Sequence, residues 1–274
     1  MKSKYLSLTA AAALLAMSSF ANTANASLLL DRGLPTDNLN NASGDNRSNV
    51  SWEWGDVNTF AGDTFTVSGT DSWKVDTITT WVTGSKEQNF WLGDKYGSLE
   101  LFFGEFGSDL TQLLTGNFVE NTNTTDNSNI TITKVNYANG DLYQGSSGSM
   151  ISLYQIDWAV DLTLEAGKEY AFGADGQGRN DEQFWFNLAS NAALSGSPQE
   201  GADDLVHAWE NGSYLGSWDT NSSSLAGTAY NGGWDKSSDI NVQLHGSVDV
   251  PEPSTLAIFA LALVGLGSRR FNKK

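Results

Sequence analysis

Few side chains in this sequence are suited to catalysis. Histidine is the usual general base near neutral pH, and the chain has only His207 and His245, which are far apart and show no HExxH spacing. Cysteine is absent, which excludes thiol catalysis and cysteine-type zinc sites. We therefore expect both histidines to have structural roles.

Serine and carboxylate side chains give no clear catalytic signal either. The segment Gly145–Ser149 does not fit the GxSxG pattern of many serine hydrolases and indicates a flexible turn. The 32 acidic residues are so numerous that some pair must lie at the roughly 5–10 Å separation that glycosidases use, so such a pair carries no information. The sequence predicts a protein that is not an enzyme.

Acidic and amide side chains gather in three predicted loops, where they offer the oxygen ligands that calcium prefers. The three clusters are Asp37, Asn38, Asn40, Asp45 and Asn46; Asp175, Asn180, Asp181 and Glu182; and Asp203 with Asp204. None has the D-x-[DN]-x-[DN]-G order of an EF-hand. The sequence thus predicts no cofactor and identifies no metal ligand. It leaves a structural calcium ion open, with solvated acidic loops as the simpler interpretation.

Three tryptophans in polar segments form the candidate binding site. Trp209, Trp218 and Trp234 stand beside Asn, Asp or Glu residues, a combination that lets a loop stack on a sugar ring and bond its hydroxyl groups. Jelly-roll carbohydrate-binding modules are built in this way, so the argument is an analogy of fold. The alternative is core packing, because a tryptophan in a β-sandwich supplies a large apolar area. The sequence leaves both open.

Charge limits the partners of the exported part of the chain. Between Ser27 and Glu252 there are nine basic and 32 acidic residues, a formal net charge of −23. Such a field repels nucleic acid and anionic lipid. We expect a soluble domain with no nucleic-acid partner.

Alternating apolar and polar residues, rich in β-branched and aromatic types, predict many short strands. Strands are expected at Leu28–Leu30, Ser51–Trp54, Phe65–Val67, Trp73–Trp81, Asn89–Gly93, Leu99–Phe106, Asn129–Tyr137, Ser149–Val160, Glu169–Gly173, Phe184–Leu188 and Ile240–Val248. The segment Thr111–Val119 fits a strand or a short helix. Positive-φ residues predict turns at Asn139-Gly140, Asp175-Gly176, Asn211-Gly212 and Asn231–Gly233. The fold class predicted is all-β, an antiparallel β-sandwich that is jelly-roll-like in strand number.

The N-terminus has the features of a secretory signal peptide. Two lysines precede an apolar stretch, and Ala24 and Ala26 form an A-x-A site, so we expect cleavage before Ser27 after passage through the Sec translocon.

The C-terminal segment has three parts in series. The first is the rigid motif Pro251, Glu252 and Pro253, where proline disfavours helix in the residue before it. An uncharged run, Leu256–Gly267, follows as a short transmembrane helix, at or below the roughly 17–25 residues that cross a bilayer. The basic tail is Arg269, Arg270, Lys273 and Lys274, which the positive-inside tendency keeps in the cytoplasm.

This order of motif, apolar run and basic tail resembles the PEP-CTERM sorting signal of Gram-negative bacteria. The resemblance implies processing near the motif by exosortase, a membrane enzyme often found in strains that make exopolysaccharide. The body of the chain is similar to PEP-CTERM ectodomains that have no assigned activity. We expect a signal peptide at 1–26, a β-sandwich ectodomain at 27–249 and a sorting signal at 250–274.

The function expected from this organisation is that of a non-catalytic, structural or adhesive protein of the cell surface or extracellular matrix. It would sit transiently in the inner membrane and then associate with exopolysaccharide or biofilm. The alternative is a carbohydrate-binding module that recognises a polysaccharide through the three tryptophans.

Overall fold

The computed structural model describes residues 27–32, 49–50, 59–83, 90–135, 143–144, 150–179, 186–188, 205–219 and 240–249. The predicted signal peptide, the PEP motif, the apolar run and the basic tail lie outside these residues. So do Ser51–Trp54, Trp234 and the turns at Asn139-Gly140 and Asn231–Gly233.

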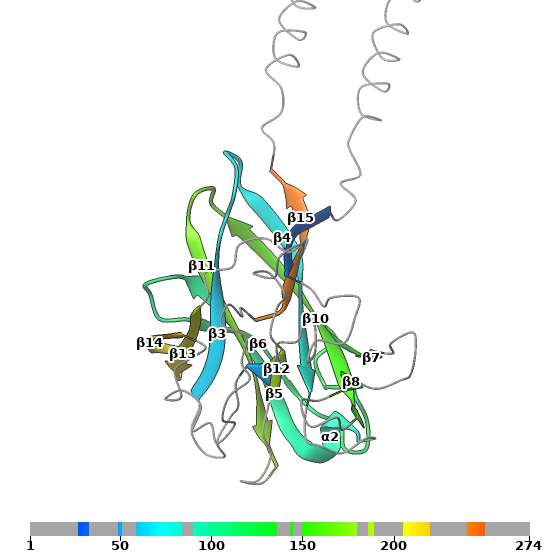
Figure 1. Ribbon diagram of the computed structural model, residues 1–274. Helices are drawn as coiled ribbons and strands as arrows, with labels where there is room; N and C mark the ends of the chain where they lie inside the picture. Colours follow the sequence, from blue (N-terminus) through cyan, green and yellow to red (C-terminus); the bar gives the residue numbers. More distant parts are fainter. Residues whose placement is uncertain are drawn as a thin grey trace, which may run out of the picture.

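Most of the described residues lie in antiparallel strands (Figure 1). The elements are β1 (Ser27–Arg32), β2 (Asn49–Val50), β3 (Thr59–Thr66), β4 (Trp73–Thr83), α2 (Leu92–Lys95), β5 (Tyr96–Glu105), β6 (Thr111–Asn117), β7 (Ile130–Val135), β8 (Tyr143–Gln144), β9 (Met150–Ile151), β10 (Leu153–Leu164), β11 (Glu169–Gly178), β12 (Phe186–Leu188), β13 (Leu205–Glu210), β14 (Ser213–Asp219) and β15 (Val242–Val248).

In the part of the chain that the structure describes, the strands form two main sheets. The first sheet has the order β1-β15-β4-β10-β7, and β12 joins β4 to β2. The second sheet has the order β14-β13-β3-β11-β5-β6, and a separate small sheet pairs β8 with β9. The prediction of an antiparallel β-sandwich is confirmed.

Alternation along the strands places one apolar face of each sheet against the other. Phe65 of the second sheet lies near the rings of Trp73, Phe103, Tyr170 and Phe172, with centroid distances of 6.2–6.5 Å. Apolar area removed from water contributes roughly 25 cal/mol per Å². These rings therefore contribute to the apolar attraction between the sheets, together with the aliphatic residues of the core.

Trp158, in β10, is fully buried in the same core, and its indole nitrogen donates to the hydroxyl of Thr80 at 3.0 Å. Because a buried indole N–H without an acceptor costs free energy, this bond lets the largest ring of the core lie there without a penalty.

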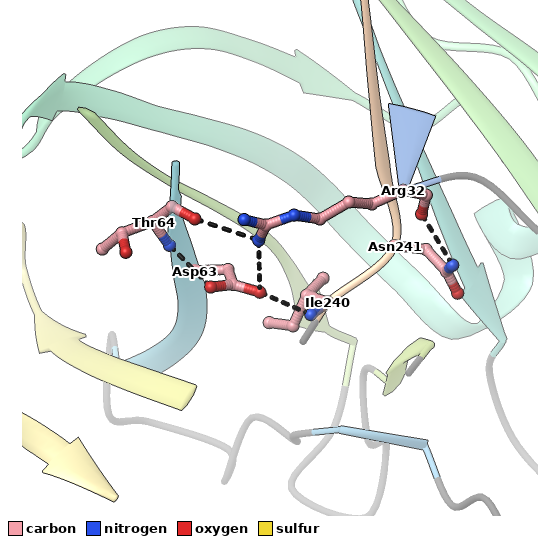
Figure 2. Close-up of polar contacts among 5 residues, drawn as sticks. All are labelled: Arg32, Asp63, Thr64, Ile240 and Asn241. Atoms are coloured by element: carbon pink, nitrogen blue, oxygen red, sulfur yellow. Dashed lines mark hydrogen bonds and ion pairs between the residues drawn. The ribbon is translucent and has the colours of Figure 1, made fainter. Parts of the chain in front are cut away.

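One ion pair joins the sheets inside the sandwich. Arg32, the last residue of β1 in the first sheet, lies 3.4 Å from the carboxylate of Asp63 in β3 of the second sheet, and both side chains are nearly inaccessible to solvent. The guanidinium also donates to the carbonyl of Thr64 at 3.0 Å. Figure 2 shows this inter-sheet ion pair with its neighbours.

The carboxylate of Asp63 has two further donors. It accepts the backbone N–H groups of Thr64 and Ile240, each at 2.6 Å, and Asn241 donates through its side chain to the carbonyl of Arg32 at 2.8 Å (Figure 2). Ile240 and Asn241 immediately precede β15. Asp63 and Arg32 therefore tie together β1, β3 and the start of β15.

Three details differ from the sequence predictions. The segment Asn89–Gly93 was predicted as a strand, but its described part leads into the short helix α2. The turn predicted at Asp175-Gly176 is wrong, because both residues pair with β5 inside β11. The β13–β14 hairpin was not predicted, although its turn at Asn211-Gly212 was: both residues have positive φ, 52° and 86°.

The inter-sheet ion pair generates a stability prediction. Changing Asp63 to Ala leaves Arg32 buried without its carboxylate and removes the acceptor of two backbone N–H groups. We expect the free energy of unfolding to fall by about 3–5 kcal/mol, measured by urea titration of the exported protein.

The matched control is Asp161→Ala, which breaks the exposed pair Lys74–Asp161, whose charged atoms lie 3.9 Å apart. Exposed pairs contribute at most about 1 kcal/mol. Equal losses in the two variants would contradict a special role for the buried pair.

Candidate functional site

The first and last described strands lie side by side and bring the two ends of the domain together. Ser27, the residue after the predicted signal-peptidase site, begins β1 and pairs with Gly246 of β15. The hydroxyl of Ser27 donates to the carbonyl of Gly246 at 3.1 Å. In Figure 1 the start of β1 and the end of β15 lie at the same end of the sandwich, called here the terminal end.

The last strand continues to the edge of the predicted sorting signal. Val248 pairs with Trp73, and the backbone N–H of Asp249 donates to the carbonyl of Ser72 at 2.7 Å. The motif Pro251–Pro253 follows within two residues of this last hydrogen bond. The motif is therefore joined to the folded domain almost without a linker.

Of the three candidate tryptophans, only the side chain of Trp209 is described. It lies in β13, is 1% exposed, and stacks on Phe60 with centroids 5.8 Å apart. An added Cβ on Gly62 would lie 2.7 Å from the same ring, so only glycine fits beneath it. In this structure Trp209 therefore packs in the interior, which is the alternative to sugar binding that the sequence left open. The backbone of Trp218 lies in β14, but its side chain, like all of Trp234, lies outside the described residues.

Trp209 belongs to a smaller apolar cluster on the face of the second sheet that points away from the main core. Phe102 shows this placement, because its neighbours Leu101 and Phe103 lie in the main core and side chains alternate along a strand. His207, 3% exposed, packs beside it against Phe106 at a centroid distance of 5.0 Å. Its Nδ1 lies 3.2 Å from the hydroxyl of Tyr214.

The two histidines lie in different sheets. His207 belongs to β13 of the second sheet, and His245 belongs to β15 of the first, where it pairs with Leu28 and Thr77. Within the described residues, no group of three or more His, Asp or Glu side chains lies close enough to hold a metal ion.

One exposed tryptophan was not singled out from the sequence. Trp91, just before α2, is 51% exposed. It lies beside the loop 119–124, because Gly93 donates to the carbonyl of Thr122 and Leu92 to the side chain of Asn123. One feature of the sequence could have indicated this exposure. In the predicted strand Asn89–Gly93, the residue on the same face two positions after Trp91 is Gly93, which offers no apolar side chain.

Two carboxyl groups lie opposite each other on adjacent strands of the second sheet. Asp175 of β11 pairs with Glu100 of β5, and residues directly opposite in an antiparallel pair have Cβ atoms about 5 Å apart. Burial raises the pKa of Asp175 to about 7, an effect that the nearby Glu100 increases and the N–H of Gly176 opposes. Burial also raises the pKa of Glu100, against a hydrogen bond from Gln112. The pair holds a proton at mildly acid pH.

None of the described helices is long and apolar enough to cross a membrane. The predicted transmembrane segment Leu256–Gly267 is not among the described residues.

Comparison with protein families finds one match. A family model described as the PEP-CTERM protein-sorting motif matches residues 249–270. The chain therefore carries a PEP-CTERM sorting motif at the position predicted from Pro251, Glu252 and Pro253, and this motif implies processing by exosortase. The motif implies an exported protein that is anchored transiently in the membrane.

No curated protein matches the chain by sequence. Among solved structures, a family 3a carbohydrate-binding module from the cipA scaffolding of Clostridium thermocellum is 13% identical, with 60% of this chain and 97% of that chain covered and a TM-score of 0.25. A CBM3a-L domain with flanking linkers from the same organism is 16% identical, covering 66% and 92%, with a TM-score of 0.23.

The flagellar cap protein FliD of Escherichia coli is 11% identical, covering 81% of this chain and 60% of that one, with a TM-score of 0.20. Likenesses at this level identify neither a shared topology nor a ligand. The fold class therefore rests on the two sheets described above.

The buried carboxyl group of Asp175 generates a pH prediction. The folded state keeps the proton up to about pH 7, whereas the unfolded state loses it near the ordinary pKa of 3.8. This contribution to stability is complete below the ordinary pKa and is lost as the pH rises through about 7. We expect Asp175→Asn, which cannot ionise, to lose less stability than the wild type between about pH 4.5 and about pH 8 in urea titrations.

Asp161→Asn, at an exposed position, is the control and should follow the wild-type pH profile. A profile of Asp175→Asn parallel to that of the wild type would contradict the assignment of the buried proton.

Proposed function

We propose that this protein is a non-catalytic structural or adhesive component of the cell surface or extracellular matrix of a Gram-negative bacterium, associated with exopolysaccharide or biofilm. The observation that carries the proposal is the PEP-CTERM motif at residues 249–270, which continues directly from the last strand of a β-sandwich. In this proposal the motif directs the sorting of the chain, and the sandwich is the part that reaches the cell surface or matrix.

The proposed route has three steps. The Sec translocon exports the chain, and signal peptidase cuts after Ala26. The segment Leu256–Gly267 then holds the protein in the inner membrane, with the basic tail from Arg269 to Lys274 in the cytoplasm. Exosortase finally processes the chain near Pro251–Pro253 and leaves the sandwich outside the cell.

A structural role agrees with the chemistry of the described residues. The two histidines belong to different sheets, and His207 is packed among aromatic rings. Of the paired carboxyl groups, Asp175 is buried and Glu100 is half-buried, so Asp175 is not open to contact with a bulky substrate. The strongly acidic domain stays soluble and can be bridged to an acidic polysaccharide by divalent cations.

Carbohydrate binding by the sandwich itself is the second candidate. Trp218 and Trp234 remain candidates from the sequence, and the buried ring of Trp209 contributes only by holding β13 in place. The observation that favours this candidate is Trp91, half exposed beside a loop rich in Asn and Thr. Figure 1 shows α2, which Trp91 precedes, at the end of the sandwich opposite the terminal end.

Sorting is tested by the intact mass of the protein from culture medium and washed cells, in strains with and without exosortase. We expect a species that begins at Ser27 and ends near Pro251–Pro253, and that disappears without the enzyme. Retention of Leu256–Lys274 in both strains would show a permanent anchor and overturn the proposed route.

Carbohydrate binding is tested by affinity electrophoresis of the exported protein in the exopolysaccharide of its own producing strain. If Trp91 stacks on a sugar ring, Trp91→Ala weakens retention about tenfold, since one stacking contact is of the order of 1–2 kcal/mol, and leaves the unfolding midpoint unchanged.

Trp209→Ala is the contrasting variant, because removing a buried tryptophan costs about 3–5 kcal/mol of stability. Wild-type retention of Trp91→Ala would exclude binding through this ring and leave the structural role.

A further inference from the structure

The terminal end of the domain is hollowed beside β1, β15 and the turn between β3 and β4. A cavity of about 280 Å³ lies there, called here the terminal mouth, lined by Ser27, Leu28, Leu29, Ser68, Gly69, Thr70, Asp71, Trp73 and Val248. Four of these residues are apolar. The cavity thus presents apolar side chains at the end of the domain where the sorting motif begins.

The apolar lining is a continuation of the core. Val248 pairs directly with Trp73, so both side chains lie on the core face of the first sheet, and Trp73 is 4% exposed while Val248 is 42% exposed. Leu28, from the adjacent strand β1, is 46% exposed. The apolar side chains at the ends of β1 and β15 are therefore left partly exposed by this domain.

The distance from the terminal mouth to the sorting motif is short. An extended chain spans about 3.3–3.6 Å per residue, so Pro251 lies within about 11 Å of Val248. The hydrogen bond from Asp249 to Ser72 fixes the chain up to Asp249, the first residue of the family match and two residues before Pro251. An enzyme that holds Pro251–Pro253 must come against this end of the sandwich, or peel the end of β15 away.

We infer that the terminal mouth is a docking surface for exosortase, which inserts an apolar side chain from its extracytoplasmic surface between Leu28, Trp73 and Val248. Asp71 at the cavity wall and Asp249 beside it favour basic groups around the inserted side chain. The inference rests on the sorting of this chain by exosortase. It adds that the enzyme reads the folded domain as well as the linear motif.

The test compares matched exposed apolar residues in the full chain, expressed in cells that contain exosortase. Leu28→Ser and Val248→Ser alter the terminal mouth; Leu215→Ser and Val119→Ser are the controls, at 50% and 48% exposure elsewhere on the surface. Conversion of the unprocessed to the processed form is followed by pulse-chase and intact mass. We expect processing to slow about fivefold or more in the mouth variants, from the loss of apolar contact area, and to keep the wild-type rate in the controls.

A further variant separates docking from strand stability. Thr70→Trp fills the cavity from the exposed turn between β3 and β4 without changing β1 or β15, and we expect it to slow processing too. Wild-type processing rates in Leu28→Ser, Val248→Ser and Thr70→Trp would overturn the inference. If the wild-type protein itself is not processed, the sorting proposal fails instead.

The occupant is identified by replacing Leu28 with the photoreactive residue p-benzoyl-phenylalanine and irradiating intact cells. A crosslink to exosortase is the expected result. Crosslinks only to lipid, or only to a second copy of this chain, would overturn the assignment of the terminal mouth to the enzyme.

Discussion

The buried ion pair between Arg32 and Asp63 is the constraint on which the rest of the structure depends. The chain has no cysteine, so no disulfide joins the sheets, and apolar packing by itself is non-directional. Asp63 adds direction: its carboxylate accepts two backbone N–H groups and lies against one guanidinium. Because Arg32 ends β1 and Ile240 precedes β15, one side chain of β3 sets the positions of the first and last strands. Those two strands in turn form one side of the terminal mouth.

Much of the fold could be predicted because strand formation is local. The predicted strands Trp73–Trp81, Leu99–Phe106 and Ile240–Val248 overlap β4, β5 and β15, and the tendency of Asn211-Gly212 towards positive φ produced the expected turn. The ion pair could not be predicted, since nothing in the sequence connects Arg32 with Asp63 or Ile240 until the sheets pack. The turn predicted at Asp175-Gly176 was wrong for a related reason: burial and pairing with β5 keep these two turn-forming residues extended.

In the candidate site, too, features set by local sequence could be predicted and features set by tertiary packing could not. The sorting motif is read as a linear sequence, so its residues and their order were sufficient to find it, and the family match lies where they predicted. Exposure of a ring is a tertiary property. Trp209 is followed by the acidic Glu210 and Trp91 stands between Phe90 and Leu92, yet the first ring is 1% and the second 51% exposed. What distinguishes them is Gly62 and Phe60 of β3, which make room for one ring and stack on it.

The placement of β15 between β4 and β1 has a mechanical consequence. While the tail holds the protein in the membrane, any pull on the exported domain enters at Asp249 and runs along the axis of β15. The hydrogen bonds to β4 and β1 lie across that axis, so they bear the load together and do not open one after another. The strand nearest the tail is thus held in the geometry that best resists extraction from its attached end.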